Sequence, residues 1–202
     1  MIFHSIQLNE TSLRNKLQET AMRRTNPMFK FKRQCTAIML LLVAGACVSV
    51  FGAPPAGDVQ LAIKNHDQLM ALIASKRGKV VVVDVWSTFC DPCIKEFPGL
   101  VRMHKKHGPE KIACVSLCVN FSGVGKPEDE IDEPLKFLQA QGAAFDNVLS
   151  SEPDEALYKK LKIASVPAIL VFGPDGKLLK AFENEVKYSE VEAFVGPLLG
   201  GK

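Results

Sequence analysis

Net positive charge is scarce in this sequence of 202 residues, which contains 25 Lys and Arg and 22 Asp and Glu. The surplus of +3 lies wholly in residues 1–53, where seven Lys and Arg outnumber two Glu, so residues 54–202 carry a charge of −2. A nucleic-acid-binding domain is recognised by a basic patch or stripe. The acidic balance of residues 54–202 excludes this class of function, and we expect no nucleic-acid partner.

Histidine is also scarce, with four residues, and the sequence contains no internal repeat. A structural zinc site needs four ligands. Cys90 and Cys93 have metal-binding spacing, but the next histidine, His104, lies eleven residues beyond Cys93, about 16 Å along a helix. We therefore expect no metal and no organic cofactor. A copper- or zinc-handling module that uses these cysteines is an alternative, and it would need a further His or Met ligand.

A long hydrophobic run is lacking too. Residues 36–51 form a charge-free, mostly apolar stretch of sixteen residues, which spans about 24 Å as a helix against a hydrocarbon core of about 30 Å. Lys30, Lys32 and Arg33 precede this stretch, and the small residues A-P-P-A-G follow it. This order is typical of a secretory leader. We predict that residues 1–53 are a leader and that residues 54–202 form the folded domain.

The leader has three possible forms. The segment A-G-A-C at residues 44–47 fits a signal-peptide cleavage site, and it also fits a lipoprotein signal in which Cys47 is lipidated. An uncleaved membrane anchor is the third form, if flanking small residues extend the span. Residues 1–27 are either untranslated, with Met28 or Met22 as the start, or disordered. Each form predicts an extracytoplasmic domain, either soluble or tethered to a membrane.

Beyond residue 58 the hydrophobic period alternates between the two-residue period of strands and the 3.6-residue period of helices. This predicts strands at residues 58–63, 79–86, 111–119, 168–172 and 177–183, and helices at residues 65–77, 92–107, 131–141, 154–162 and 188–199. The P-D-G sequence at residues 174–176 predicts a hairpin between the last two strands. Together the elements predict an α/β fold with a central mixed sheet and helices on both faces.

The segment C-D-P-C at residues 90–93 carries the chemistry. It follows a buried strand and begins a helix, with Pro92 as the expected first helical residue. Cys90 would then lie at the helix N-terminus, where unpaired N–H groups stabilise a thiolate. Cys93 lies one turn later on the same face, close enough for a disulfide with Cys90. An exposed attacking thiol beside a buried resolving thiol is what dithiol exchange requires.

The surrounding residues resemble the thioredoxin superfamily, and more closely its exported TlpA/ResA-like branch. That branch's pattern W-x-T-x-C-x-P-C-x-x-E-x-P-x-L is matched by Trp86, Thr88, Cys90, Pro92, Cys93, Glu96, Pro98 and Leu100. The resemblance implies a thioredoxin fold over residues 58–200 and disulfide exchange with envelope proteins. The implied partners are a protein disulfide and an upstream thiol electron donor. In the resembled branch the substrates include apocytochrome cysteines, as in cytochrome c maturation. We expect a monomer.

The same resemblance implies roles for residues outside the C-D-P-C segment. Asp84, six residues before Cys90, occupies the place of the family's buried acid and would accept the proton of Cys93. A carboxylate in an apolar strand costs several kcal/mol unless it has a partner, which also favours a role. Val166 and Pro167 correspond to the family's cis-proline loop, and we predict that their bond is cis. Val166 and Trp86 are predicted to line the substrate groove, and for Trp86 the favoured alternative is packing against the active-site loop.

Four residues are predicted to tune the redox chemistry: Asp91, Pro92, Glu96 and Trp86. The carboxylate of Asp91 would oppose a thiolate on Cys90, which favours a reductase-like potential. Glu96 is expected to be exposed, and Pro98 is expected to bend the helix without ending it. A non-catalytic envelope binding module with a static disulfide is a further alternative.

The other two cysteines of the domain, Cys114 and Cys118, are predicted to share one face of a strand. Four residues of strand separate their Cα atoms by about 13 Å, beyond the limit of about 7 Å for a disulfide. We expect both thiols to be free and largely buried.

Overall fold

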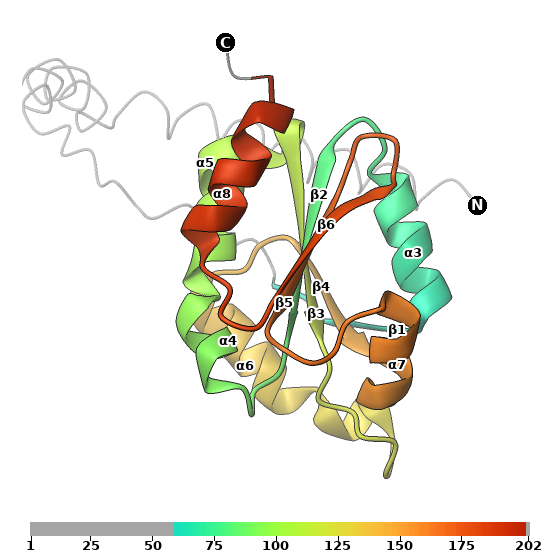
Figure 1. The fold of residues 1–202 in the computed structure, drawn as a ribbon. Helices are drawn as coiled ribbons and strands as arrows, with labels where there is room; N and C mark the ends of the chain where they lie inside the picture. The colour runs from blue at the N-terminus through green and yellow to red at the C-terminus, as the bar shows by residue number, and fades with distance from the viewer. Residues whose placement is uncertain (1–58, 201–202) are drawn as a thin grey trace, which may run out of the picture. The chain divides into compact units, whose positions relative to one another are not determined.

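Within residues 59–200, which the computed structural model describes, six strands form a mixed sheet (Figure 1). The strands are β1 (Ala62–Lys64), β2 (Val80–Trp86), β3 (Ile112–Cys118), β4 (Asp146–Ser150), β5 (Ala168–Phe172) and β6 (Leu178–Glu183). Their order across the sheet is β1-β4-β3-β2-β5-β6. The first four are parallel neighbours, whereas β5 runs antiparallel to both β2 and β6. The predicted mixed sheet and closing hairpin are confirmed.

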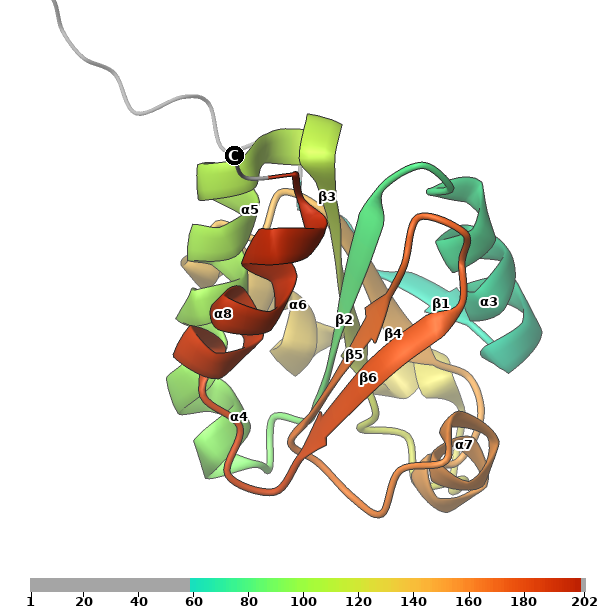
Figure 2. The same cartoon turned by 45° about the horizontal axis from the view of Figure 1, so that its top comes forward.

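Helices cover both faces of this sheet, as Figure 2 shows. The helices are α3 (His66–Ser75), α4 (Asp91–Glu96), α5 (Pro98–Lys111), α6 (Asp132–Gln141), α7 (Asp154–Leu161) and α8 (Tyr188–Leu198), with a short 3₁₀ helix η3 (Pro127–Glu130). Helices α4, α5, α6 and α8 pack on one face, and α3 and α7 pack on the other. The fold is the predicted thioredoxin-like α/β arrangement.

Strand β2 is buried along its whole length because both of its faces are covered. Its side chains alternate between two hydrophobic cores. Val82 and Trp86 pack under α4, α5, α6 and α8, whereas Val83 and Val85 pack under α3 and α7. Since successive side chains of a strand point to opposite faces, Asp84 shares the face of Val82 and Trp86. The acid therefore lies on the side of the sheet that carries α4.

Strand β4 was not among the predicted elements. Its first residues, Asp146 and Asn147, are typical of loops, and they hide the short apolar pair that follows. In the structure the Asn147 amide donates to three backbone carbonyls, and its Oδ1 accepts from Ser116 Oγ on β3. The polar side chain is fully used inside the sheet, so it does not interrupt the strand.

The predicted helix at residues 92–107 is divided at Pro98 into α4 and α5. Phe97, between the two, keeps helical dihedrals (φ −49°, ψ −37°), and its N–H still donates to the Cys93 carbonyl at 2.9 Å. The chain therefore bends at Pro98 without leaving the helical conformation, as predicted. Gly108 has a positive φ of 62° and marks a second change of direction near the end of α5.

The predicted leader at residues 1–53, with its candidate lipidation site Cys47, lies outside the described residues. Among the helices of residues 59–200, none has the length and apolar character to cross a membrane.

Candidate active site

Cys90 and Cys93 form a disulfide at the start of α4, with their Cα atoms 5.2 Å apart. Cys90 is the N-cap residue, and its Sγ accepts a hydrogen bond from the Cys93 backbone N–H at 3.3 Å. Cys90 is partly exposed, whereas Cys93 is only 3% exposed. An incoming nucleophile or substrate therefore reaches the sulfur of Cys90, and Cys93 can react only with its neighbour.

The loop between β2 and Cys90 is held by the side chain of Asn120, which follows β3. Its Oδ1 accepts from Ser87 Oγ at 2.9 Å and from the Thr88 N–H at 3.0 Å. Its Nδ2 donates to Thr88 Oγ1 at 2.7 Å, and Cys118 Sγ donates to the same Oδ1 at 3.2 Å. Sequence reasoning missed Asn120. A polar residue directly after a buried strand was the available signal.

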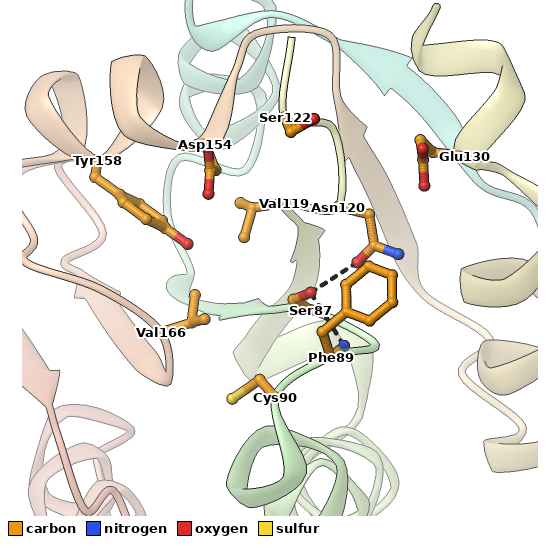
Figure 3. Close-up of a pocket in the computed structure, with 10 residues that line it drawn as sticks. All are labelled: Ser87, Phe89, Cys90, Val119, Asn120, Ser122, Glu130, Asp154, Tyr158 and Val166. Atoms are coloured by element: carbon orange, nitrogen blue, oxygen red, sulfur yellow. Dashed lines mark hydrogen bonds between the residues drawn. The ribbon is translucent and has the colours of Figure 1, made fainter. Parts of the chain in front are cut away.

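A cleft of about 490 Å³ opens beside Cys90 (Figure 3). Val166 lines it next to Cys90, and the predicted cis bond between Val166 and Pro167 is confirmed. Pro167 directly precedes β5, whose first residue Ala168 pairs with Val85 of β2. The antiparallel pairing of β5 with β2 thus brings the Val166–Pro167 loop and the disulfide to the same end of the sheet.

Asp84 is 4% exposed and accepts a hydrogen bond from the Tyr188 hydroxyl on α8. Burial raises the pKa of Asp84, and the hydrogen bond from Tyr188 opposes part of this rise. The resulting pKa is about 7, compared with an ordinary value of 3.8. Burial and then the charge of Asp84 raise the pKa of Tyr188 well above its ordinary value, so the phenol remains a donor. A carboxyl group near neutral pKa is suited to accept and return a proton.

Gly99 on α5 creates the space that the Tyr188 ring occupies. A Cβ atom at Gly99 would lie 2.2 Å from Tyr188 Cγ, which no side chain could tolerate. Sequence reasoning missed both residues. Tyr188 is one of only two tyrosines in the sequence, and a tyrosine amid apolar residues usually has a partner for its hydroxyl.

The prediction that Trp86 lines the substrate groove is wrong. Its side chain is 0% exposed and packs with its ring centroid 5.1 Å from Phe97 and 4.9 Å from Phe137. Trp86 lies in β2 on the covered face of the sheet, so helices α5 and α6 separate it from solvent. Trp86 therefore packs inside the domain and does not contact a substrate in the cleft.

Three further residues were predicted to tune the disulfide. Asp91 is the first residue of α4 and is exposed, so Pro92 is the second helical residue, one place later than predicted. Glu96 is half-buried, contrary to the expected exposure. Its charge adds the smallest share to the raised pKa of Tyr188, after burial, Asp84 and Cys114. Glu96 thus acts on the Tyr188 phenol from α4.

Cys114 and Cys118 are both free and buried, as predicted. Burial raises the pKa of each thiol to about 12, so neither is a thiolate at neutral pH. Within residues 59–200, no group of three or more His, Cys, Asp and Glu side chains is placed to hold a metal ion.

Comparison with known proteins shows to which family the chain belongs. A family model described as thioredoxin-like matches residues 78–178, which include the disulfide, Asp84 and Pro167. The chain belongs to the thioredoxin-like family. This thioredoxin-like chain is 20% identical to the thiol-disulfide oxidoreductase ResA of Bacillus subtilis over 176 residues, which cover 83% of this chain and 93% of that protein.

Two other similarities are of the same kind. The thiol:disulfide interchange protein HelX of Rhodobacter capsulatus is 26% identical over 124 residues, which cover 61% of this thioredoxin-like chain and 63% of HelX. The solved structure of a thiol-disulfide isomerase from Corynebacterium glutamicum has a TM-score of 0.53 and 21% identity, and the match covers 71% of this chain and 96% of that one. The structural match supports the fold.

Proposed function

We infer that this chain is a thiol–disulfide oxidoreductase. The observation that carries the inference is the disulfide between a partly exposed Cys90 at a helix N-cap and a buried Cys93, open to a cleft beside Val166. The names of the ResA and HelX relatives support the same reaction class. The disulfide itself is the redox group, and the reaction needs no other cofactor.

The proposed direction is reduction of a substrate disulfide. The Cys90 thiolate attacks one sulfur of the substrate disulfide, forms a mixed disulfide and releases the other sulfur as a thiolate. Cys93 then attacks Cys90 Sγ, which forms the Cys90–Cys93 disulfide and releases the second substrate thiolate. Two electrons pass to the substrate, and an upstream dithiol restores the reduced enzyme.

In this scheme Asp84 accepts the proton of Cys93 and returns it to the leaving thiolate. Three observations support the role: the burial of Asp84, its pKa near 7, and its place on the face of β2 that carries α4. Pro167 shapes the edge of the cleft against which the substrate chain lies. Tyr188 does not touch the reacting sulfurs, and it acts as a positioning residue through its bond to Asp84.

The proposed location is outside the cytoplasm, on the strength of the leader pattern in residues 1–53. The proposed substrates are disulfides of envelope proteins, with apocytochrome cysteines as one class, and the proposed enzyme works as a monomer. The leader either is removed or tethers the domain to the membrane.

The test is insulin reduction by the purified protein with dithiothreitol as donor. We expect turnover by the wild type and none by Cys90→Ser. Cys93→Ser should accumulate mixed disulfides with insulin, since the resolving thiol is missing. Unchanged turnover by Cys90→Ser would refute the dithiol mechanism and leave the static disulfide as the better interpretation.

A further inference from the structure

The cleft beside Cys90 carries negative charge on the side away from the disulfide. Two carboxylates line it: Glu130 at the end of η3 and Asp154 at the start of α7. Figure 3 shows both across the cleft from Cys90, with the Asp154 carboxylate directed into the hollow. The residues that line the cleft include no Lys, Arg or His. Any ligand that enters the cleft therefore meets a negative potential.

Neither carboxylate is neutralised by a salt bridge within residues 59–200. Asp154 Oδ1 accepts from the Glu155 N–H at 2.8 Å, which leaves its other oxygen for a ligand. Both residues are half-buried, so water screens their charges less than on an open surface.

The charges of these carboxylates act on Tyr158, which lines the cleft, and on the buried thiol of Cys118. Burial raises the pKa of Tyr158 to about 12, and the charge of Asp154 is the next cause. Glu130 contributes in the same direction to the raised pKa of Cys118, behind the effect of burial. Tyr158 lines the cleft, and its hydroxyl points toward the hollow in Figure 3.

Two apolar residues line the cleft next to Cys90: Val166 and Phe89, the residue before Cys90, which is 78% exposed. Val119 lies farther from Cys90, beyond Ser87 (Figure 3). An exposed aromatic ring beside a nucleophile offers contact area to a peptide that passes over it. The cleft thus combines a sulfur nucleophile, an apolar surface and two unpaired carboxylates.

We propose that the cleft selects substrates in which a Lys or Arg lies near the target cysteine in an extended segment. The proposal rests on the proposed function, because the substrate is placed by its disulfide at Cys90. The apolar surface contacts the residues next to the substrate cysteine, and Glu130 and Asp154 bind the cationic side chain. Electrostatic complementarity of this kind raises association rates and discriminates against acidic partners.

The experiment uses short peptides that contain one cysteine joined as a 2-pyridyl disulfide, with Lys, Ala or Glu placed in turn at the positions flanking the cysteine. The prereduced protein supplies both electrons. Cys90 attacks the peptide sulfur, forms a mixed disulfide with the peptide and releases 2-thiopyridone, whose absorbance gives the rate. Cys93 then attacks Cys90 Sγ and releases the peptide thiol.

At low salt we expect the wild type to react about tenfold faster with the best Lys peptide than with its Glu counterpart, which is the size expected for two partly exposed ion pairs. The double variant Glu130→Gln/Asp154→Asn should lose most of this ratio. Because the readout is a ratio between peptides, a general loss of activity in the variant cancels.

The matched control is Glu133→Gln/Glu155→Gln. It also removes two negative charges, from exposed positions on α6 and α7 that do not line the cleft. This control variant should keep the wild-type ratio. Raising salt from about 0.1 M to about 1 M shortens the screening length from about 10 Å to about 3 Å and should reduce the wild-type ratio.

Two results would overturn the proposal: the cleft variant keeps the wild-type ratio, or the control variant loses as much as the cleft variant. The second result would mean that net charge alone governs the rate. Failure of the proposed function looks different, since the prereduced wild type would then fail to react with dipyridyl disulfide, which is small and uncharged.

Discussion

The hydroxyl of Tyr188 on α8 donates a 2.5 Å hydrogen bond to the carboxylate of Asp84 on β2, and the two residues are 104 positions apart in sequence. Both are buried, at 4% exposure each. The bond stabilises the ionised form of Asp84 and opposes the rise in its pKa that burial causes. Tyr188 thus lowers the pH at which Asp84 accepts a proton, against the larger effect of burial.

Tyr188→Phe should raise the pKa of Asp84 above its value of about 7, because the carboxylate loses its donor while remaining buried. The pH profile of insulin reduction should move in the same direction. Carboxyl chemical shifts of Asp84 in NMR titrations of wild type and variant measure the change directly. A role confined to packing would lower stability and leave the titration of Asp84 where it is.

Asp84 should make the oxidised protein less stable as pH rises. Its folded pKa of about 7 exceeds the ordinary aspartate pKa of 3.8, so the native state holds the proton more tightly than the unfolded state. The contribution of Asp84 to stability is full below about pH 4 and is lost as pH rises to about 7, by up to about 4 kcal/mol. Denaturant unfolding across this range should show the loss in the wild type, whereas Asp84→Asn should remove it. Equal pH dependence in both proteins would contradict the raised pKa.

Gly99→Ala should displace Tyr188, since the new Cβ would lie 2.2 Å from the ring. Overpacking of this kind costs about 1–3 kcal/mol, and the displaced phenol should shift the pH profile as Tyr188→Phe does. Gly196→Ala is the matched control, because nothing lies within 4 Å of its added Cβ. Pro197 follows Gly196 and disfavours a Cβ on the residue before it in a helix, so this control measures the backbone cost of an added methyl without a clash at Tyr188. Thermal unfolding of the two variants decides the comparison.

Asp91→Asn should make the Cys90–Cys93 disulfide easier to reduce. Asp91 is exposed at the first position of α4, next to Cys90, where its carboxylate opposes a thiolate on that residue. Removing the charge should raise the reduction potential by up to about 30 mV. Equilibration of each protein with glutathione buffers gives the two potentials. A wild-type value near about −120 mV, typical of a strong oxidant, would contradict the reductase-like prediction.

The sequence was sufficient where a residue's environment is local. Cys90 and Cys93 are three positions apart at a strand-to-helix junction, and the helix N-cap follows from that order. The β5–β6 hairpin likewise follows from a four-residue turn, closed by a 2.8 Å bond from the Gly176 N–H to the Gly173 carbonyl. Short-range geometry of this kind can be inferred from spacing alone.

The remaining features depend on contacts between distant segments. In the sequence, Asn147 is typical of a loop. Only the tertiary structure shows that Ser116 Oγ and three backbone carbonyls satisfy its side-chain amide inside the sheet. The sequence left open whether Trp86 lines the groove or packs under the active-site loop, and its contacts with Phe97, between α4 and α5, and with Phe137 on α6 decide for packing. No local pattern indicates that Tyr188 reaches Asp84, because the tertiary packing of α8 determines the pair.

The position of Tyr188 in the chain also determines which fragments can hold a complete redox centre. A nascent chain presents both cysteines of the disulfide and Asp84 long before α8 has been synthesised. A product truncated ahead of residue 188 would retain the whole C-D-P-C segment and could still oxidise to the Cys90–Cys93 disulfide. Its Asp84 would have no phenol to stabilise the ionised carboxylate. Loss of the last helix would therefore give a protein whose cysteines test as oxidised in thiol assays. Its disulfide exchange would nevertheless depend on pH differently from that of the full chain.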